Sequence, residues 1–315
     1  LQTRGFRCAV VERGALRGRD QEWNISESEL EELLTAAGVI TDQDKSAMSD
    51  IVGVKFNPLR AGFKNGENDP NGVETFCEDV LNLGVRPTAL IEATKQHFIK
   101  SGGRVFEQQG VTGLTVHPDG IAVAGDADFS ISGRLVLDCM GNGSPAVRQA
   151  RWGQKPDGMC LVVGSCARGS GFKDNTSGDI IYANTPIIRG QQYFWEAFPA
   201  GSGPNDRTTY MFAYMDADES RISLLSMLED YWELMPKYQG VKLDELEFKR
   251  VLFGFFPTYK TNSPLQPQFN RLLQIGDASG VQSPVSFGGL AALARHINRT
   301  TGALTEALEE DMLGR

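Results

Sequence analysis

The sequence lacks the features that mark several classes of protein. No apolar run approaches the roughly 18 residues that a membrane-spanning helix needs. The five cysteines include no C-x-x-C pair, and the three histidines, His97, His117 and His296, are far apart and match no metal spacing. No Ser/His/Asp signature of acyl transfer is present. The chain is therefore expected to be soluble or peripheral to a membrane, without a metal site.

Positive charge is also in deficit. The chain has 31 lysines and arginines against 40 aspartates and glutamates, which gives a net charge of −9. Because a negative protein repels phosphate backbones, nucleic acid is not an expected partner.

Four of the five cysteines lie in apolar, strand-like surroundings and are expected to be buried free thiols, which fits a reducing compartment.

The length and composition are those of a globular protein with a sizeable core. The 315 residues favour two domains, or one domain with a large insertion, and 41% of them are apolar.

The first residues resemble the end of a helix that stops at Gly5, and a buried strand is expected over residues 6–12. A strand and most of a helix are therefore expected upstream of Leu1.

Helix signals are clear in the first third of the chain. Residues 26–29, Ser-Glu-Ser-Glu, form a capping box that predicts a helix ending at Gly38. Pro87 can open a second helix, which ends at Gly102. Residues 55–84 lie between the two helices and are rich in glycine, asparagine and proline, so they are expected to form loop.

Strand patterns dominate from residue 104 onward. Shorter strands are expected over residues 104–107, 111–116, 121–124, 129–131 and 135–138, and longer ones over 159–164, 180–183, 192–198, 208–214 and 250–256. One helix near residues 224–232 interrupts the longer strands. Residues 158–256 are expected to form a mixed, largely antiparallel sheet with a covering helix. A buried strand over 272–276 and a helix over 287–308 close the chain.

The first motif with chemical meaning is Val10-Val11-Glu12. In dinucleotide-binding folds an acidic residue at the end of the second strand accepts hydrogen bonds from a ribose, about 20 residues after a glycine-rich turn. Counted back from Glu12, that turn would precede Leu1. Taken alone, a solvated glutamate at a strand end explains the pattern equally well.

Two further motifs place an aspartate between a strand and a glycine-rich turn. In the first, Asp138 is followed by Gly141 and a helix start, which is also compatible with an ordinary strand-to-helix turn. The second, residues 273–289, is more specific. It delivers Asp277, which can bind a ribityl hydroxyl, onto a turn that leads to Gly288 and Gly289. A helix beginning there offers free N–H groups and partial positive charge to a reduced flavin ring.

The order of these motifs resembles the superfamily of flavoprotein monooxygenases, geranylgeranyl reductases and lycopene cyclases. Residues 10–13 resemble its ribose site, residues 138–148 its D-G-x-x-S-x-V-R segment and residues 276–289 its G-D-A segment, while Arg86 and Leu90 resemble its R-x-x-L element. The chain looks most like the lycopene-cyclase-like FAD/NAD(P)-binding oxidoreductases of plant and algal chloroplasts. The superfamily's G-x-G-x-x-G turn is absent.

The resemblance implies FAD as cofactor and a chloroplast location, in the stroma or associated with the thylakoid. It implies an α/β fold: an FAD-binding Rossmann-like domain of the glutathione-reductase type with an inserted, mixed and largely antiparallel β-sheet substrate domain. The FAD domain is expected over 1–54, 85–157 and 263–315, and the substrate domain over 55–84 and 158–262. The expected cofactor-binding residues are Glu12, Arg13, Arg86, Asp138, Gly141, Gly276, Asp277, Pro284, Gly288 and Gly289.

Glu196 is the candidate catalytic residue. An acid flanked by Phe194, Trp195 and Phe198 on a strand can have a raised pKa and donate a proton. The segment is similar to the F-x-E-E segment of lycopene cyclases, in which an acidic residue protonates the polyene, although here Ala197 replaces the second acid. A glutamate with aromatic packing neighbours on an edge strand is the simpler alternative.

These features favour an FAD-dependent oxidoreductase that acts on an apolar, isoprenoid-type small molecule. Two alternatives stay open. One is a catalytically degenerate flavoprotein fold that serves as a structural or assembly subunit of a larger chloroplast complex, which the missing glycine turn favours. The other is a redox-neutral, flavin-dependent cyclase with Glu196 as the acid. Association with a membrane surface or a large complex is compatible with each.

Overall fold

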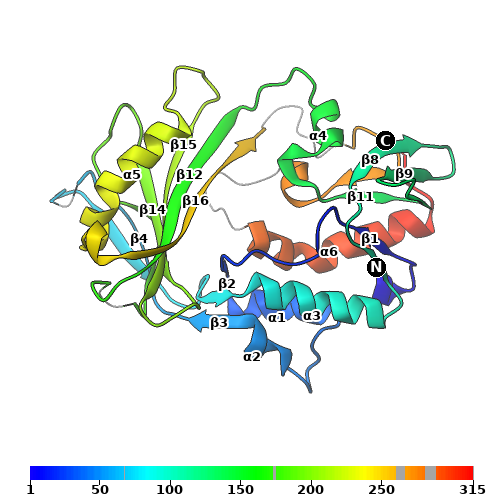
Figure 1. Cartoon of the computed structure of the whole chain (residues 1–315), viewed down its shortest axis with the longest axis horizontal. Helices are drawn as coiled ribbons and strands as arrows, with labels where there is room; N and C mark the ends of the chain where they lie inside the picture. Colours follow the sequence, from blue (N-terminus) through cyan, green and yellow to red (C-terminus); the bar gives the residue numbers. More distant parts are fainter. Residues whose placement is uncertain (67, 173–174, 260–266, 281–288, 315) are drawn as a thin grey trace.

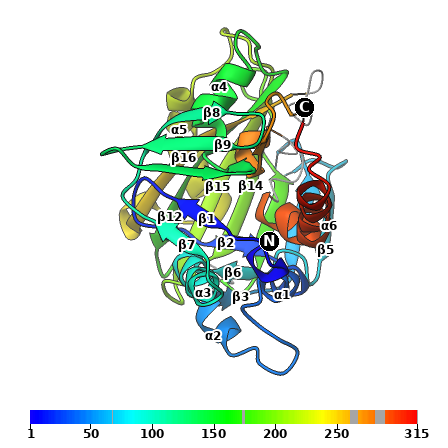
Figure 2. The same ribbon diagram turned by 90° about the vertical axis from the view of Figure 1, so that its right-hand side faces the viewer.

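A large sheet on one side of the molecule faces a layer of helices and small sheets on the other (Figure 1). The computed structural model describes residues 1–66, 68–172, 175–259, 267–280 and 289–314. Both chain ends lie in the part with the helices and small sheets, which Figure 2 shows in front of the large sheet. None of the helices in these described ranges combines the length and the apolar character that crossing a bilayer requires.

Within the described residues, the part that carries both chain ends contains four small sheets. The two parallel pairs are β1 (Ala9–Val11) with β7 (Arg104–Phe106), and β11 (Val136–Asp138) with β17 (Leu272–Gln274). The antiparallel sheets are β2 (Trp23–Ile25), β6 (Leu83–Val85) and β3 (Val52–Lys55), in that order, and β10 (Ser130–Gly133), β9 (Ile121–Gly125) and β8 (Val111–Val116).

Two helices of this part, α1 and α3, begin where the local signals predict. In α1 (Glu27–Ala36) the Glu29 carboxylate accepts a hydrogen bond from the Ser26 N–H at 3.2 Å, which completes the expected capping box. Helix α3 (Pro87–Lys100) begins at its proline. The remaining helical elements of this part are η1 (Gln2–Arg4), α2 (Ala47–Ile51), η2 (Gly141–Gly143), α4 (Pro145–Ala150), η4 (Gly276–Ser279) and α6 (Gly289–Glu309).

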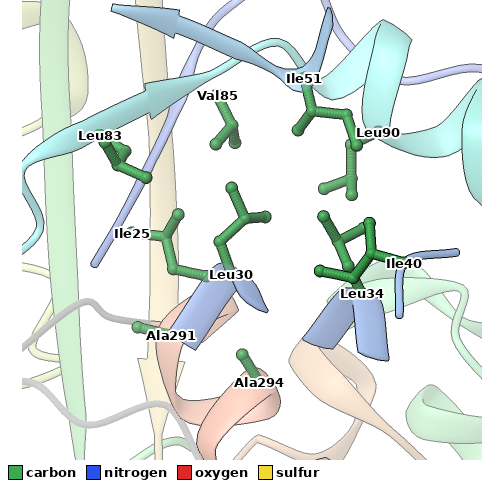
Figure 3. Packing of buried hydrophobic residues seen from close by; sticks show 10 residues of the cluster. All are labelled: Ile25, Leu30, Leu34, Ile40, Ile51, Leu83, Val85, Leu90, Ala291 and Ala294. Carbon is green, nitrogen blue, oxygen red and sulfur yellow. The ribbon is translucent and has the colours of Figure 1, made fainter. Parts of the chain in front are cut away.

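Helices and strand side chains share one apolar core in this part (Figure 3). Leu30 and Leu34 of α1 pack between the β2–β6–β3 sheet and Ala294 of α6. The small alanine side chains on α6 let the two helices approach closely. The buried members of the core are Ile25, Leu30, Leu34, Ile40, Ile51, Leu83, Val85, Leu90, Ala291 and Ala294. This core fixes the start of α6 relative to the first strands.

The large sheet has seven strands in the order β16-β12-β15-β14-β13-β4-β5. Its strands are β4 (Leu59–Phe63), β5 (Val73–Cys77), β12 (Gly158–Arg168), β13 (Gly178–Ala183), β14 (Tyr193–Pro199), β15 (Asp206–Met215) and β16 (Glu247–Thr258). Neighbours are antiparallel except β13 and β4, which are parallel. This is the mixed, largely antiparallel sheet that the sequence predicts.

The expectation that residues 55–84 form loop is wrong. This segment supplies β4, β5 and most of β6. Gly62 lies inside β4 because a Cβ there would come within 2.6 Å of the Val73 carbonyl oxygen on β5. The glycine therefore permits close strand pairing rather than a turn. Strand β6 pairs with β2 and β3, so the strand lies across the expected domain boundary after residue 84. The full division into domains remains a prediction.

One face of the large sheet is covered by α5 (Leu224–Gln239), which is followed by the short η3 (Leu243–Glu245). Tyr193 and Trp195 of β14 point to this covered face, where they pack with Tyr231 of α5. The Trp195 ring stacks on Tyr238 with 4.4 Å between centroids. Side chains alternate along a strand, so Phe194 and Glu196 point to the opposite face, toward the helical layer.

Candidate functional site

Two of the glycine-rich turns predicted to bind cofactor meet in the structure. They follow β11 and β17, which are parallel neighbours, so both turns leave the same edge of that sheet. The Ile275 N–H donates to the Asp138 carbonyl oxygen at 2.9 Å. A Cβ built on Gly141 would lie 4.0 Å from the Cβ of Asp277. Ligands of open α/β sheets bind at the carboxyl ends of strands, which is where this pair of turns lies.

Asp138 shapes the first of these turns. Its side chain is buried, one carboxylate oxygen accepts from the Met140 N–H at 3.0 Å, and the other accepts from the Ser144 hydroxyl at 2.6 Å. Ser144 in turn caps α4 by accepting from the Ala146 N–H at 3.1 Å. Both carboxylate oxygens are thus engaged by the protein. Direct contact between Asp138 and a cofactor remains a prediction, and the observed bonds give it a positioning role.

The second turn presents an acid and positive-φ glycines. Asp277 is exposed, and Gly276 and Gly280 have φ of +63° and +68°, which glycine adopts without strain. Gly289 is half-buried at the start of α6, and this end of α6 lies toward the large sheet (Figure 1). Pro284 and Gly288, also expected at the cofactor, lie outside the described residues.

The remaining expected cofactor residues lie on other elements. Glu12 follows β1, which belongs to a different two-stranded sheet, and its carboxylate accepts from the Gly14 N–H at 2.9 Å. Arg13 beside it is exposed. Arg86 is the N-cap of α3 and is exposed, with Nη2 at 3.5 Å from the Ser49 carbonyl oxygen. Contact of these three residues with a cofactor remains a prediction.

Glu196 is an acid buried within an aromatic sheet face. It lies on β14 opposite Tyr210 of β15, and Phe194 lies opposite Phe212. The side chain is 9% exposed, and burial raises the pKa of its carboxyl from 4.5 to about 8. Among the described residues, no charge or hydrogen bond contributes to that shift. The carboxyl is therefore largely protonated at neutral pH and can donate a proton or a hydrogen bond.

The groups beside Glu196 also stay protonated. Burial and the nearby Glu196 raise the pKa of the Tyr210 hydroxyl and of the Cys160 thiol well above their usual ranges. Cys160, Val162 and Phe212 are buried in this face, with Phe194, Tyr210, Tyr214 and Phe256 packed around them. This cluster thus places a neutral acid among apolar and aromatic side chains.

Arg151 is a residue that the sequence analysis did not identify. It is 8% exposed, and its guanidinium donates to the Ala278 carbonyl oxygen at 3.0 Å. The same guanidinium lies 4.5 Å from the centroid of the ring of Tyr259, the residue that follows β16. Arg151 therefore joins the second glycine turn to the chain segments that enter and leave the large sheet. No local sequence pattern signals this contact, because its partners lie more than a hundred residues away.

The described residues also show the surroundings of the candidate metal ligands and of the cysteines. No group of three or more acidic, histidine or cysteine side chains in those ranges could hold a metal ion. All five cysteines are free thiols, as expected. The expectation that most are buried is wrong in part. Only Cys160 and Cys166 are fully buried, and Cys139 is exposed because it lies in the turn after β11.

Comparison with known proteins shows the fold. No protein-family model and no curated protein matches the chain. Among solved structures, the halogenase PltM is 13% identical, with a TM-score of 0.69 over 100% of this chain and 67% of the halogenase. A geranylgeranyl bacteriochlorophyll reductase-like protein from Thermoplasma acidophilum is 14% identical, with a TM-score of 0.68 over 99% of this chain and 75% of that protein.

A third neighbour is aklavinone-11 hydroxylase, whose structure contains FAD and aklavinone. It is 17% identical, with a TM-score of 0.63 over 98% of this chain and 59% of the hydroxylase. The chain thus spans about two thirds of the length of the halogenase, and less of the hydroxylase. At these identities the likeness is one of fold. The chain therefore has the fold of these proteins, and solved structures of the halogenase and the hydroxylase contain FAD.

Proposed function

We propose that this protein binds FAD and acts as an FAD-dependent oxidoreductase on an apolar, isoprenoid-type molecule. The observation that carries the proposal is the meeting of the η2 and η4 turns at the carboxyl ends of β11 and β17. Solved structures of the same fold, including halogenase PltM and aklavinone-11 hydroxylase, contain FAD.

The residues at these turns suit FAD. Asp277 offers an exposed carboxylate to ribityl hydroxyl groups, and the backbone at Gly141 and Gly276 can approach a ligand closely. The first N–H groups of α6 lack intrahelical partners and favour negative charge on the nearby part of a ligand. When bound, FAD would supply hydride or electron transfer. The protein's own part is to hold the cofactor and to exclude water.

The substrate side of the proposal rests on the Glu196 face of the large sheet. Around Glu196 its side chains are apolar or aromatic, so they favour a ligand with little polar surface there. Thr208 and Arg250 lie farther along the same face. Strand alternation places these side chains on the face opposite α5, and that face of the sheet looks toward α6 (Figure 1). A substrate held against this face would therefore lie between the sheet and the start of α6.

Glu196 favours a second candidate, the redox-neutral cyclase. A neutral carboxylic acid in an aromatic surround can protonate a carbon–carbon double bond of a polyene, and the surrounding rings stabilise the cation that forms. In an oxidoreductase the same carboxyl would instead orient the substrate by donating a hydrogen bond. The two functions differ in whether electrons leave the substrate.

Anaerobic incubation of the flavin-loaded protein with linear isoprenoids tests the proposal. An oxidoreductase changes the redox state of the bound flavin, which its visible absorbance records, and alters the hydrogen content of the product. A cyclase yields an isomer of the substrate and leaves the flavin spectrum as it was. A protein that does neither with any apolar substrate, and that carries no flavin, would favour the structural or assembly role.

A further inference from the structure

An exposed phenylalanine continues the Glu196 face to the surface of the molecule. Phe63, the last residue of β4, is 56% exposed. Its ring meets that of Phe194 edge-on, with 5.7 Å between centroids and an interplanar angle of 84°. An exposed apolar side chain that adjoins a larger apolar patch can extend a ligand-binding surface.

The contact extends inward from Phe194. The Phe194 ring meets Tyr214 edge-on with 5.6 Å between centroids. Phe194 and Glu196 are two residues apart on β14, so their side chains share a face and are separated by roughly 7 Å along the strand. The exposed Phe63, the Phe194 ring and the buried acid therefore lie on one face of the sheet, with Phe194 in contact with Phe63 and two residues from Glu196.

The hairpin also carries a phenylalanine that lies off this row. Phe76 on β5 is 62% exposed and is paired with Arg60 of β4. The Arg60 guanidinium lies 4.0 Å from the centroid of the Tyr182 ring, which belongs to the core under α5. Phe76 is therefore on the α5 face, while Phe63 is on the Glu196 face. The two phenylalanines are similarly exposed, but Phe63 lies on the Glu196 face of the sheet and Phe76 lies on the α5 face.

We propose that Phe63 and Phe194 form the outer end of the ligand-binding face, and that the ligand is a long linear apolar chain extending from Glu196 to the β4–β5 hairpin. The proposal deepens the substrate side of the proposed function and rests on it. A short ligand at Glu196 cannot reach Phe63, so this residue selects for ligand length. The ligand is thus an extended hydrocarbon such as a polyisoprenoid.

Binding of two linear isoprenoid alcohols tests the proposal directly. Geraniol is the short probe and geranylgeraniol its longer homologue, each delivered from cyclodextrin to the whole protein at equilibrium. We expect the parent protein to bind the longer probe more tightly. Phe63→Ser should weaken binding of geranylgeraniol by about tenfold and leave geraniol unchanged, because only the longer chain loses apolar contact. Phe76→Ser, the matched control, should change neither affinity.

Three results would overturn the proposal: equal loss of affinity for both probes in Phe63→Ser, the same loss in Phe76→Ser, or no preference for the longer probe in the parent. Sedimentation of each variant tests the competing possibility that Phe63 joins two copies of the chain. A change in oligomeric state with unchanged probe binding would establish that possibility instead. Flavin content, measured on the same samples, separates failure of this proposal from failure of the proposed cofactor.

Discussion

The Arg151 guanidinium donates a hydrogen bond to the Ala278 carbonyl oxygen at 3.0 Å and lies 4.5 Å from the centroid of the Tyr259 ring. A Cβ on Gly280 would come within 2.4 Å of the same guanidinium, so the η4 turn is packed directly against it. One buried side chain therefore sets the distance between the proposed cofactor turn and the large sheet.

Replacement of Arg151 should disturb both stability and cofactor retention. Arg151→Met removes the hydrogen bond and leaves the Ala278 carbonyl unpartnered, which should cost about 1–3 kcal/mol of unfolding free energy. Because the η4 turn then loosens, flavin affinity should fall as well. Denaturant unfolding and flavin titration measure the two effects. The exposed Arg221, paired with Asp216, supplies the control Arg221→Met, which should change neither. An Arg151→Met protein as stable as the parent would show that the contact is dispensable.

Asp277→Ala should weaken FAD binding while the fold is retained. The carboxylate lies at an exposed turn, and loss of its hydrogen bonds to ribityl hydroxyls should cost about 1–3 kcal/mol, which is about five- to 150-fold in affinity. Quenching of flavin fluorescence gives the dissociation constant. Asp119→Ala changes an equally exposed acid in a remote turn and serves as control. Identical flavin affinity in the parent and Asp277→Ala would remove Asp277 from the site.

Gly289→Val should displace a flavin from the start of α6 without unfolding the helix. A valine side chain there would occupy the space before the first free N–H groups of α6. Gly302→Val is the matched control on the same helix, because a Cβ at Gly302 meets nothing within 4 Å. If Gly289 instead permits tight packing of helix on strand, its variant should lose thermal stability while the folded fraction keeps a normal flavin spectrum. Melting temperature and flavin occupancy on one sample decide between these outcomes.

Glu196 should make stability depend on pH. Its folded pKa, about 8, lies above its ordinary value of 4.5. Below pH 4.5 both states hold this proton, and the contribution of Glu196 to stability is at its most favourable. Between 4.5 and 8 the unfolded state loses the proton first, so stability falls by up to about 1.4 kcal/mol per pH unit.

Glu196→Gln cannot ionise, so this variant should lose that part of the pH dependence. Denaturant unfolding at about pH 5 and at about pH 8 measures the difference. Glu233→Gln, at a site that is 73% exposed, should keep the parent's slope. Equal slopes in Glu196→Gln and the parent would contradict the assignment of a buried, protonated acid.

The sequence predicted those helix starts that depend on interactions between residues close together in the chain. The capping box before α1 and the proline of α3 act within one turn of the chain, so both helix starts were predicted correctly. The hairpin of β4 and β5 was missed because its stability comes from β13, more than a hundred residues away. Its glycines and asparagines are typical of loops, although Gly62 is required by the distance between two strands.

The same distinction applies to the site. A strand–Asp–glycine pattern predicts each turn separately, and the pairing of β11 with β17 brings the two together. The aromatics around Glu196 were recognised only on its own strand. Tyr210, Phe212 and Cys160 reach it from β15 and β12, and strand register cannot be derived from one sequence. Arg151 was missed for the same reason, since its partners are remote in the chain.

The central claim is that the protein binds FAD, and the visible absorbance of the purified whole protein tests it most directly. We predict a yellow protein with the spectrum of oxidised flavin, close to one flavin per chain, and release of FAD on denaturation. A colourless protein that also fails to bind added FAD would contradict the account.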